Sequence, residues 1–388
     1  MLKEKVSDVK KLLLPMHSVG GIDVEFLILC VALLLFGALM NFSASSVYAE
    51  QLYGDRYYFL VRYILFAVLS VAAVWLFVVY ATREFWYRFA VIIYVAAIGM
   101  LALVLVIGTV GGGAQRWLRI GPITVQPSEV AKLAVVMMLA RFLGDNEQRV
   151  TGSGKGNFLY GVLLPGCIIG AIGVLVALEK HISGLMIIGM IGISVMFLGG
   201  TRLKWILLIG GAVVLAGSGL IAVSEYAQTR VNTWLHITEV DPLGEAWQTL
   251  QGLYAIGSGG IFGLGLFGGR QKFGYVSQPQ NDFVFTIICE ELGFFGAAAV
   301  ILLFALLVIR GFRIAVHERD RFLALVVFGL TCKVAIQTIL NIAVVTNSMP
   351  NTGISLPFFS SGGTSLALQI FEMGMILNLS RYSTLSKA

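Results

Sequence analysis

The sequence predicts an all-α polytopic membrane protein of about ten transmembrane helices, with a large extracytoplasmic loop between the seventh and the eighth. Of the 388 residues, 58% are hydrophobic and 12% are charged, whereas about a quarter of the residues of a soluble domain are charged. Mean hydropathy is +0.88. A soluble enzyme is therefore excluded, and the surplus of Lys and Arg indicates cytoplasmic loops rather than nucleic-acid binding.

The apolar runs predict one membrane domain, residues 24–380, between a cytoplasmic segment (1–23) and a cytoplasmic tail (381–388). Most runs have the roughly 17–25 residues that a membrane-crossing helix needs. The fourth and the tenth are short and carry polar residues. The predicted spans are 24–46, 58–80, 88–108, 127–143, 158–178, 183–199, 206–224, 283–310, 324–346 and 364–380.

The distribution of basic residues orients these spans. With both termini in the cytoplasm, 17 of the 27 Lys and Arg residues fall in inner segments, and every inner loop carries at least two. Cytoplasmic loops carry such an excess in plasma-membrane proteins. The longest loop, about 225–282, is then extracytoplasmic. Its stretch EAWQTLQGLYAIGSGGIFGLGLFGG is apolar and rich in glycine, which predicts a re-entrant or interfacial segment.

No motif specifies a cofactor. The four cysteines lie singly in apolar runs and the four histidines in separate loops, so the sequence predicts neither a disulfide framework nor a metal cage. A divalent cation, Mg²⁺ or Mn²⁺, stays compatible with the chain. Gly263, Gly265 and Gly268 match G-x-G-x-x-G, but they follow no strand and lie on the outer side. They predict close backbone packing rather than a dinucleotide site.

A polar motif opens the fourth span, in QRWLRIGPITVQPSEVAKL. Pro127 suits the first turn of a helix, with Gln126 or Ser128 near its cap and Glu129 favoured by the helix dipole. Lys132 follows Glu129 by three residues, so both share one face just inside the membrane. Charges at that depth usually pair and face a cavity. A functional pair and a purely structural ion pair both remain open.

Three acids occur close together in SQPQNDFVFTIICEELGFFG. Asp282 stands at the outer mouth of the eighth span, as a helix cap or as a general base. At about 100° per residue, Glu290 lies about 80° and Glu291 about 180° round the helix from Asp282. The three carboxylates therefore do not share one site. Glu290 and Glu291 are predicted to make structural polar contacts inside the bundle.

Two further features allow two interpretations each. Arg62, early in the second span, either snorkels to the outer interface or lines an anion-binding cavity. The segment PNTGISLPFFSSGGTSL (350–366) predicts a fixed non-helical hairpin, because it holds two prolines and three glycines. Its hydroxyl groups, including those of Ser361 and Thr364, either bind sugar or phosphate oxygens or serve only in packing.

Four stretches, in this order, resemble the shape, elongation, division and sporulation (SEDS) family of RodA, FtsW and SpoVE. They are QRWLRIGPITVQPSEVAKL, EAWQTLQGLYAIGSGG, GLFGGRQKFGYVSQPQNDFVFTIICEELGFFG and NTGISLPFFSSGGTSL. The resemblance runs over nearly the whole chain. Lys180 and His181 stand where proline and aspartate are common in the family, and FSSGG lacks its usual tyrosine. The histidine and the PQNDF context favour the FtsW/SpoVE branch.

The resemblance implies a ten-span peptidoglycan glycosyltransferase that polymerises lipid II at the outer face of the plasma membrane. It also implies a class B penicillin-binding protein as partner. The family's catalytic aspartate corresponds to Asp282, and its conserved arginine of the second span to Arg62. Its Q-P-S-E-x-x-K motif corresponds to Gln126, Ser128, Glu129 and Lys132.

The reaction needs a base for the attacking hydroxyl and positive charge for the diphosphate leaving group. We expect Asp282 to be the base, and a set of basic residues to bind diphosphate: Lys132, Arg62, Arg270 and Lys272. Two alternatives remain. A lipid II flippase would use a deeper polar path through Glu290, Glu291 and Lys333. A non-enzymatic scaffold for the penicillin-binding protein would not need Asp282. Roles in division, elongation and sporulation are not distinguished.

Overall fold

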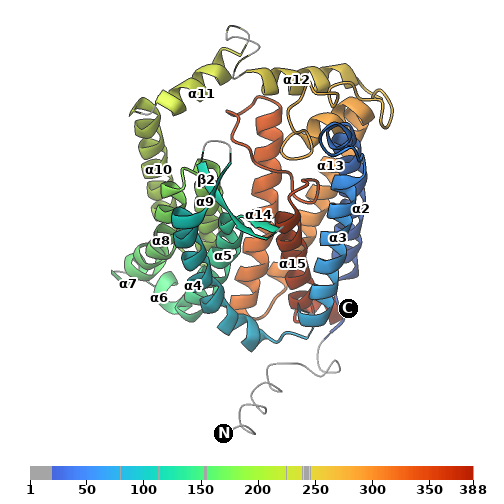
Figure 1. Ribbon diagram of the computed structural model, residues 1–388. Coiled ribbons are helices and arrows are strands. Elements are labelled where there is room, and N and C mark those ends of the chain that lie inside the picture. The colour runs from blue at the N-terminus through green and yellow to red at the C-terminus, as the bar shows by residue number, and fades with distance from the viewer. Residues whose placement is uncertain are drawn as a thin grey trace.

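The computed structural model of the chain describes residues 20–387, apart from 79, 112–113, 122, 153–154, 224, 238, 240–243 and 245. The described part is a bundle of roughly parallel and antiparallel helices with one small sheet (Figure 1). The long helices coincide with the ten predicted spans, which confirms the predicted fold class. They are α2 (Val24–Tyr53), α3 (Tyr58–Ala73, continued by a π-helical turn Val74–Val78), α4 (Arg83–Ile107), α5 (Pro127–Asp145), α8 (Leu164–Leu178), α9 (Ile182–Leu198), α10 (Leu203–Val223), α13 (Val284–Val316), α14 (Arg321–Val345) and α15 (Gly363–Ser380).

The helices differ in how apolar they are. In the described residues, six helical segments are long and apolar enough to cross a bilayer, whereas α9 and part of α10 are apolar but shorter. Helices α5 and α15 carry more polar residues. Most side chains of α5 are buried, because it packs against α4, α8, α9 and α14. A helix enclosed by other helices does not need an apolar surface toward lipid.

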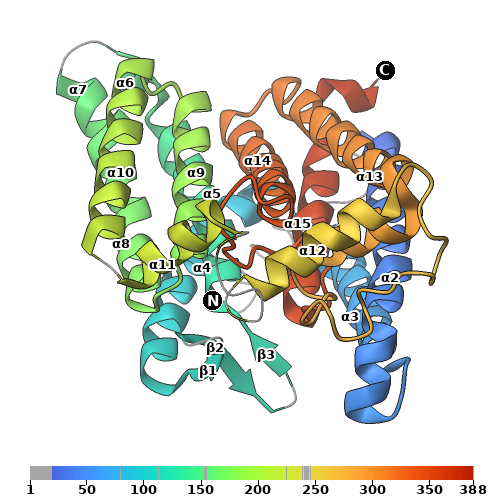
Figure 2. The same cartoon turned by 90° about the horizontal axis from the view of Figure 1, so that it is seen from above.

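The bundle has two sides joined by α5 and α14. Figure 2 shows α8, α9 and α10 on one side and α2, α3, α13 and α15 on the other. The start of α2 and the end of α15 meet at one end of the bundle, where Asp23 N–H donates to Ser380 Oγ over 3.0 Å. Both ends of the described chain therefore lie on the same side of the bundle.

Several short elements complete the fold. Strands β1 (Thr109–Gly111), β2 (Ala114–Ile120) and β3 (Ile123–Val125) form an antiparallel sheet in the order β1-β2-β3. The sequence did not predict this sheet, because its strands are short and lie within a loop. The remaining elements are α6 (Glu147–Thr151), α7 (Lys155–Phe158), a π-helical turn (Leu159–Leu163), α11 (Glu225–Leu235), α12 (Trp247–Gly259) and a 3₁₀ turn (Thr384–Lys387).

The long loop between α10 and α13 contains helix α12, which lies across one end of the bundle, opposite the chain ends (Figure 1). Both interpretations of this stretch, re-entrant or interfacial, stay predictions. After α12 the chain packs against a break in α13 at Gly293, whose φ of 64° is not helical. Leu264 N–H donates to Glu290 O, and Phe294 N–H donates to Gly260 O, each over 2.9 Å.

Glycine permits this close contact. A Cβ at Gly263 would lie 2.1 Å from Glu291 O, and the residue has a φ of 78°. The prediction that the G-x-G-x-x-G match serves close backbone packing is therefore confirmed at Gly263. A second close backbone contact occurs one turn earlier, where a Cβ at Gly259 would lie 1.9 Å from Cys289 O.

We expect Gly259→Ala to lower the free energy of unfolding by about 1–3 kcal/mol, because the new methyl group overlaps the backbone of α13. Gly257→Ala is the matched control on the same helix, since a Cβ there meets nothing within 4 Å. It should be neutral or stabilising, as alanine is favoured over glycine in helices. Thermal unfolding of both purified variants in detergent checks the pair. Equal unfolding midpoints would contradict the close contact between α12 and α13.

Candidate active site

The charged residues of the predicted site meet in a cavity of about 580 Å³. Its wall is built by residues from β2, α5, α9, α11, α12, α14 and α15, together with the turn 180–181 and the segments 281–282 and 350–362. This volume is in the range of sites for ligands of drug size. The charged residues of the wall are Asp282, Glu129, Lys132, Arg116, Lys180 and Arg230.

Asp282 lies just before α13 and is held by its backbone. Asn341 Nδ2 donates to Asp282 O over 2.8 Å and to Ile354 O over 2.6 Å, which ties the aspartate to the 350–362 segment. Gly353, with a φ of 64°, lies against the carboxylate, since a Cβ there would be 3.2 Å from Oδ2. The N-cap of α13 is Phe283, so Asp282 does not cap the helix. Burial raises the pKa of the Asp282 carboxyl to about 6.

Glu129 and Lys132 form an ion pair that also faces the cavity. Helix α5 begins with Pro127 after the N-cap Gln126, as the sequence predicted. Lys132 Nζ lies 2.6 Å from Glu129 Oε1, and their side chains are 2% and 12% exposed. Gln126 lines the same cavity. The ion pair is therefore present and lines the cavity, and its functional role stays a prediction.

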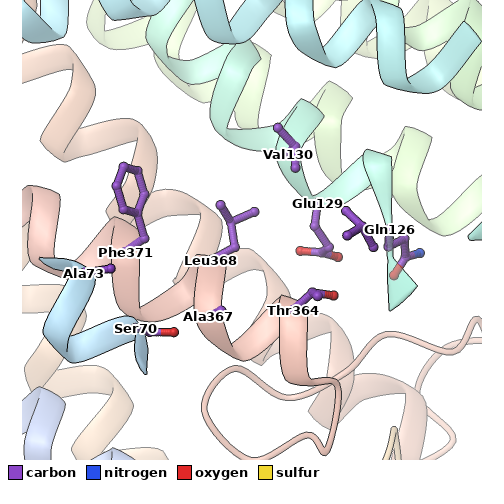
Figure 3. Close-up of a pocket in the computed structure, with 10 residues that line it drawn as sticks. Ser70, Ala73, Gln126, Glu129, Val130, Thr364, Ala367, Leu368 and Phe371 are labelled. Atoms are coloured by element: carbon purple, nitrogen blue, oxygen red, sulfur yellow. The ribbon is translucent and has the colours of Figure 1, made fainter. Parts of the chain in front are cut away.

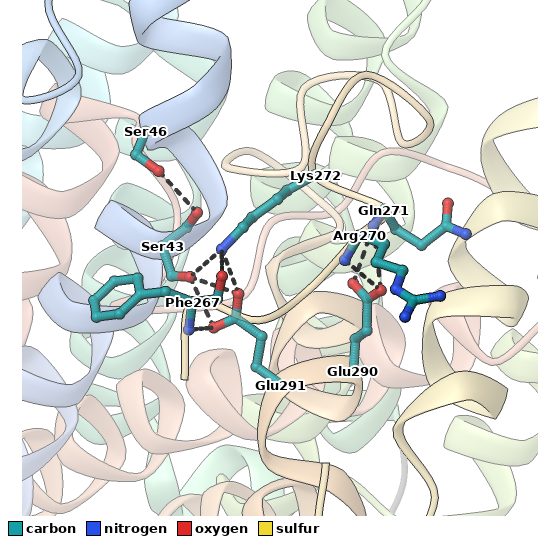
Figure 4. Close-up of polar contacts among 8 residues, drawn as sticks. All are labelled: Ser43, Ser46, Phe267, Arg270, Gln271, Lys272, Glu290 and Glu291. Atoms are coloured by element: carbon teal, nitrogen blue, oxygen red, sulfur yellow. Dashed lines mark hydrogen bonds and ion pairs between the residues drawn. The ribbon is translucent and has the colours of Figure 1, made fainter. Parts of the chain in front are cut away.

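Glu290 and Glu291 hold the loop that follows α12 (Figure 4). Arg270 N–H donates to Glu290 Oε1 over 2.7 Å. Glu291 accepts the Ser43 hydroxyl over 2.7 Å and forms a 2.7 Å ion pair with Lys272 Nζ. Both glutamates are buried, in contacts away from Asp282. The separation that helical phase predicted is present, although Asp282 itself precedes the helix.

Three basic residues expected at the diphosphate lie elsewhere in this structure. Lys272 is buried against Glu291, so its charge is already matched. Arg270 is exposed on the loop that follows α12. Arg62 Nη1 donates to Tyr58 Oη over 3.0 Å, and its guanidinium lies 5.6 Å from the centre of that ring. None of the three belongs to the described wall of the cavity, because each is drawn to a closer partner or to the surface.

Of the serine and threonine side chains near the predicted site, some line the cavity and others bond to neighbouring residues. Ser361 donates to Asn281 Oδ1 over 2.7 Å, and Thr364 donates to Thr124 O over 2.8 Å. Ser128 is buried and is not part of the described cavity wall. Ser360 and Ser365 line the cavity instead. The 350–362 segment is non-helical, as predicted, and it supplies backbone to the cavity wall.

Sequence reasoning missed three basic residues of the wall, namely Arg116, Lys180 and Arg230. Arg116 Nη2 donates to Lys180 O over 2.8 Å, which joins β2 to the turn between α8 and α9. Arg230 Nη1 donates to Asn351 O, which joins α11 to the 350–362 segment. Each residue comes from a loop element that the apolar pattern did not resolve. The basic residues in QRWLRIG were the one available signal, and that signal does not say which of them faces inward.

The turn between α8 and α9 explains why Lys180 stands at a position where proline is common in the family that the sequence resembles. Lys180 has a φ of 55°, its N–H donates to Ala177 O, and His181 N–H donates to Val176 O. This is a Schellman end of α8. Proline cannot form it, because its φ is fixed near −65° and it lacks an N–H. Burial, with Arg116 and Lys132 nearby, lowers the pKa of His181 to about 4, so this wall residue is neutral at pH 7.

An apolar pocket of about 300 Å³ lies beside the cavity, between α3, α5 and α15 (Figure 3). Ala73, Val130, Leu368 and Phe371 contribute its apolar lining. Gln126 and Glu129 belong to the walls of both the pocket and the cavity. The polar site therefore adjoins an apolar recess at the start of α5.

Within the part of the chain that the structure describes, no group of three or more His, Cys, Asp or Glu side chains comes together. The possibility of Mg²⁺ or Mn²⁺ stays a prediction of the sequence.

Comparison with known proteins decides the family. The FtsW/RodA/SpoVE model, described as a cell cycle protein, matches residues 24–385. The chain belongs to this family. Stage V sporulation protein E of Bacillus subtilis is 37% identical, over 93% of this chain and 97% of that protein. A probable peptidoglycan glycosyltransferase FtsW of Trichlorobacter lovleyi is 36% identical, over 92% and 93%.

Solved structures agree with the fold. One chain of a peptidoglycan synthase complex that coordinates polymerization and crosslinking superposes with a TM-score of 0.76. It is 26% identical and covers 94% of this chain and 98% of its own. RodA of Thermus thermophilus superposes with a TM-score of 0.68 at 24% identity, over 94% and 98%. The protein is a multi-pass membrane protein of this fold.

Proposed function

We propose that this protein is a peptidoglycan glycosyltransferase that polymerises lipid II into glycan strands. The observation that carries the proposal is the placement of Asp282 in one cavity with Arg116, Lys180 and Arg230, beside the Glu129–Lys132 pair. Glycosyl transfer from a lipid diphosphate needs a base for the acceptor hydroxyl and positive charge for the leaving diphosphate. The cavity wall offers both kinds of group.

The roles follow from charge and position. Asp282, with a pKa of about 6, is ionised at pH 7 and can accept a proton from a sugar hydroxyl. The basic side chains of the wall attract the diphosphate and stabilise the charge that develops on it. They replace Arg62, Arg270 and Lys272 in the role expected from the sequence. The neutral His181 adds no charge at this pH.

The adjoining apolar pocket fits the lipid part of such a substrate. A prenyl chain in the bilayer would reach α3, α5 and α15 from the side, while its diphosphate and sugars occupy the polar cavity. Gln126 and Glu129, which border both spaces, lie where head group and chain would join. A soluble sugar nucleotide would have no use for this recess.

The flippase alternative receives less support from the charged residues that suggested it. Glu290 and Glu291 hold the outer loop, and Lys333 pairs with Glu372 at 2.6 Å inside the bundle. Matched charges of this kind do not form an open polar path. A scaffold without activity would not require the concentration of charge around Asp282.

Partner and orientation are parts of the same proposal. The similarity to a chain of a synthase complex that polymerises and crosslinks supports a class B penicillin-binding protein as partner. The excess of basic residues in the inner segments supports cytoplasmic termini. The end that carries α11, α12 and the cavity would then face the outside, where lipid II is used.

The test is reconstitution of the purified protein with its penicillin-binding partner in vesicles that carry lipid II. Glycan polymer and movement of lipid II between leaflets are measured in the same sample. A polymerase makes strands from lipid II in the outer leaflet. Movement without polymer would support a flippase, and neither activity would support a scaffold.

We expect polymerisation to fall as pH drops through about 6, because protonation of Asp282 removes the base. The pKa of this acid is raised, so the active ionised form is present above pH 6 and is lost below it. The pH profile of kcat/KM checks this, with vesicle integrity followed at each pH. A profile that stays flat down to pH 5 would contradict the role of Asp282 as base.

A further inference from the structure

A network of four charged side chains extends from the cavity wall into the bundle, contributed by three helices. Glu129 and Lys132 come from α5, Lys333 from α14 and Glu372 from α15. Lys333 Nζ lies 2.6 Å from Glu372 Oε2 and 3.9 Å from Glu129 Oε2. Lys333 and Glu372 are 1% and 0% exposed. Such a network in the interior of a membrane protein is costly, so it calls for a function.

The network is arranged asymmetrically around Glu129. Its Oε1 is bound by Lys132 at 2.6 Å, whereas its Oε2 lies 3.9 Å from Lys333. Lys333 is turned toward Glu372, whose two oxygens lie 2.8 and 2.6 Å from its Nζ. Glu129 and Lys132 line the cavity, whereas Lys333 and Glu372 lie behind them. Glu372 therefore keeps Lys333 from competing with Lys132 for Glu129.

This arrangement sets the charge at the cavity wall. While Glu372 matches Lys333, the carboxylate of Glu129 stays on Lys132, and the Glu129–Lys132 pair is close to neutral. If the charge of Glu372 were removed, Lys333 would draw Glu129 toward α14. Lys132 would then present an unmatched ammonium to the cavity, where an anionic group would hold it more tightly.

We propose that Lys333 and Glu372 are positioning residues, which hold the Glu129 carboxylate on Lys132 and thereby limit how tightly the site retains a diphosphate. This inference rests on the proposed function and assigns a role to two residues that touch no substrate. Release of the diphosphate product needs moderate rather than maximal positive charge. The predicted signature is a site that binds diphosphate better and turns over more slowly when Glu372 is neutral.

Two double variants distinguish this positioning role from a purely structural role of the Lys333–Glu372 pair. Exchanging the pair, with Lys333→Glu and Glu372→Lys together, keeps an ion pair but places an acid beside Glu129. Replacing the pair with Lys333→Met and Glu372→Leu removes both charges, a change that buried ion pairs often tolerate without loss of stability. If the pair is purely structural, both double variants should keep kcat and Kd near the wild-type values. If the pair positions Glu129, the reversed pair should change kcat and Kd.

The experiment compares these variants and Glu372→Gln with wild type, in complex with the partner. The readouts are kcat and KM for lipid II, the Kd of a short-chain prenyl diphosphate and the thermal unfolding midpoint. For Glu372→Gln we expect kcat to fall and the Kd of the prenyl diphosphate to fall about 10-fold. The reason is that Glu129 shifts from Lys132 to Lys333, which leaves the Lys132 ammonium to bind the diphosphate. The reversed pair should lower kcat about 10-fold, and the apolar pair much less.

A reversed pair that folds and has wild-type kcat and Kd would overturn the proposal. If that variant does not fold, Glu372→Gln decides, because an unchanged Kd for the prenyl diphosphate would equally overturn it. The binding measurement needs no turnover. Absence of polymer in wild type would therefore refute the proposed function, while the ratio of Kd values would still test the network.

Discussion

Replacing Asp282 by asparagine lowers kcat for polymerisation by about 10²–10⁴-fold, the usual cost of losing a general base. Asparagine has nearly the same shape but cannot accept the proton of the attacking hydroxyl. The bonds from Asn341 go to the backbone of Asp282, so they survive the change. Removing a partly buried charge whose pKa burial has raised should not destabilise the fold. The loss should therefore appear in kcat rather than in stability.

The measurement is steady-state polymerisation by the purified complex, with the unfolding midpoint of each sample. Asp55→Asn is the matched control, because Asp55 is exposed in the turn between α2 and α3, away from the cavity. It should polymerise as wild type does. Glycan synthesis at the wild-type rate by the Asp282→Asn complex would remove Asp282 from the mechanism.

The Lys272→Met variant should lose about 3–5 kcal/mol of unfolding free energy, the typical cost of breaking a buried ion pair from one side. Lys272 is 3% exposed and Glu291 is fully buried, at a distance of 2.7 Å. The substitution leaves the charge of Glu291 without its cation. Glu291 also accepts the Ser43 hydroxyl and the Phe267 N–H, so the loop after α12 loosens from α2 and α13.

Unfolding midpoints in detergent test this, with Arg270→Met as control. Arg270 is two residues away, exposed, and bound to Glu290 through its backbone only. Its substitution should change the midpoint far less. If Lys272→Met instead keeps the wild-type midpoint and raises KM, Lys272 binds substrate, as the sequence first suggested.

The sequence predicted the spans well because their signal is local. A run of apolar residues long enough to cross the bilayer must form a helix, since backbone groups in lipid have no other partners. The start of α5 at Pro127 was also predicted from a local signal, because proline suits the first turn of a helix. Asp282, Glu129 and Lys132 could be selected because charges beside or within such runs are rare.

The membership of the cavity wall was only partly predictable. Arg116, Lys180 and Arg230 reach the cavity from the sheet, a helix end and α11, which are short elements without an apolar signature. Conversely, Arg270 and Lys272 stand close to Asp282 in the sequence but lie elsewhere in the structure. Closeness in sequence does not fix which way a side chain points once the backbone turns.

The sequence by itself determined the helices and the residues at which charge enters the bundle, because burial in lipid constrains each segment separately. Only the tertiary structure decided which charges meet. Lys272 pairs with Glu291 and lies beside Ser43 of α2, and Lys333 with Glu372 of α15, through contacts between distant segments. Pairing depends on distance in space, and in a low-dielectric interior the nearest opposite charge determines whether a lysine is available to a substrate or is already neutralised.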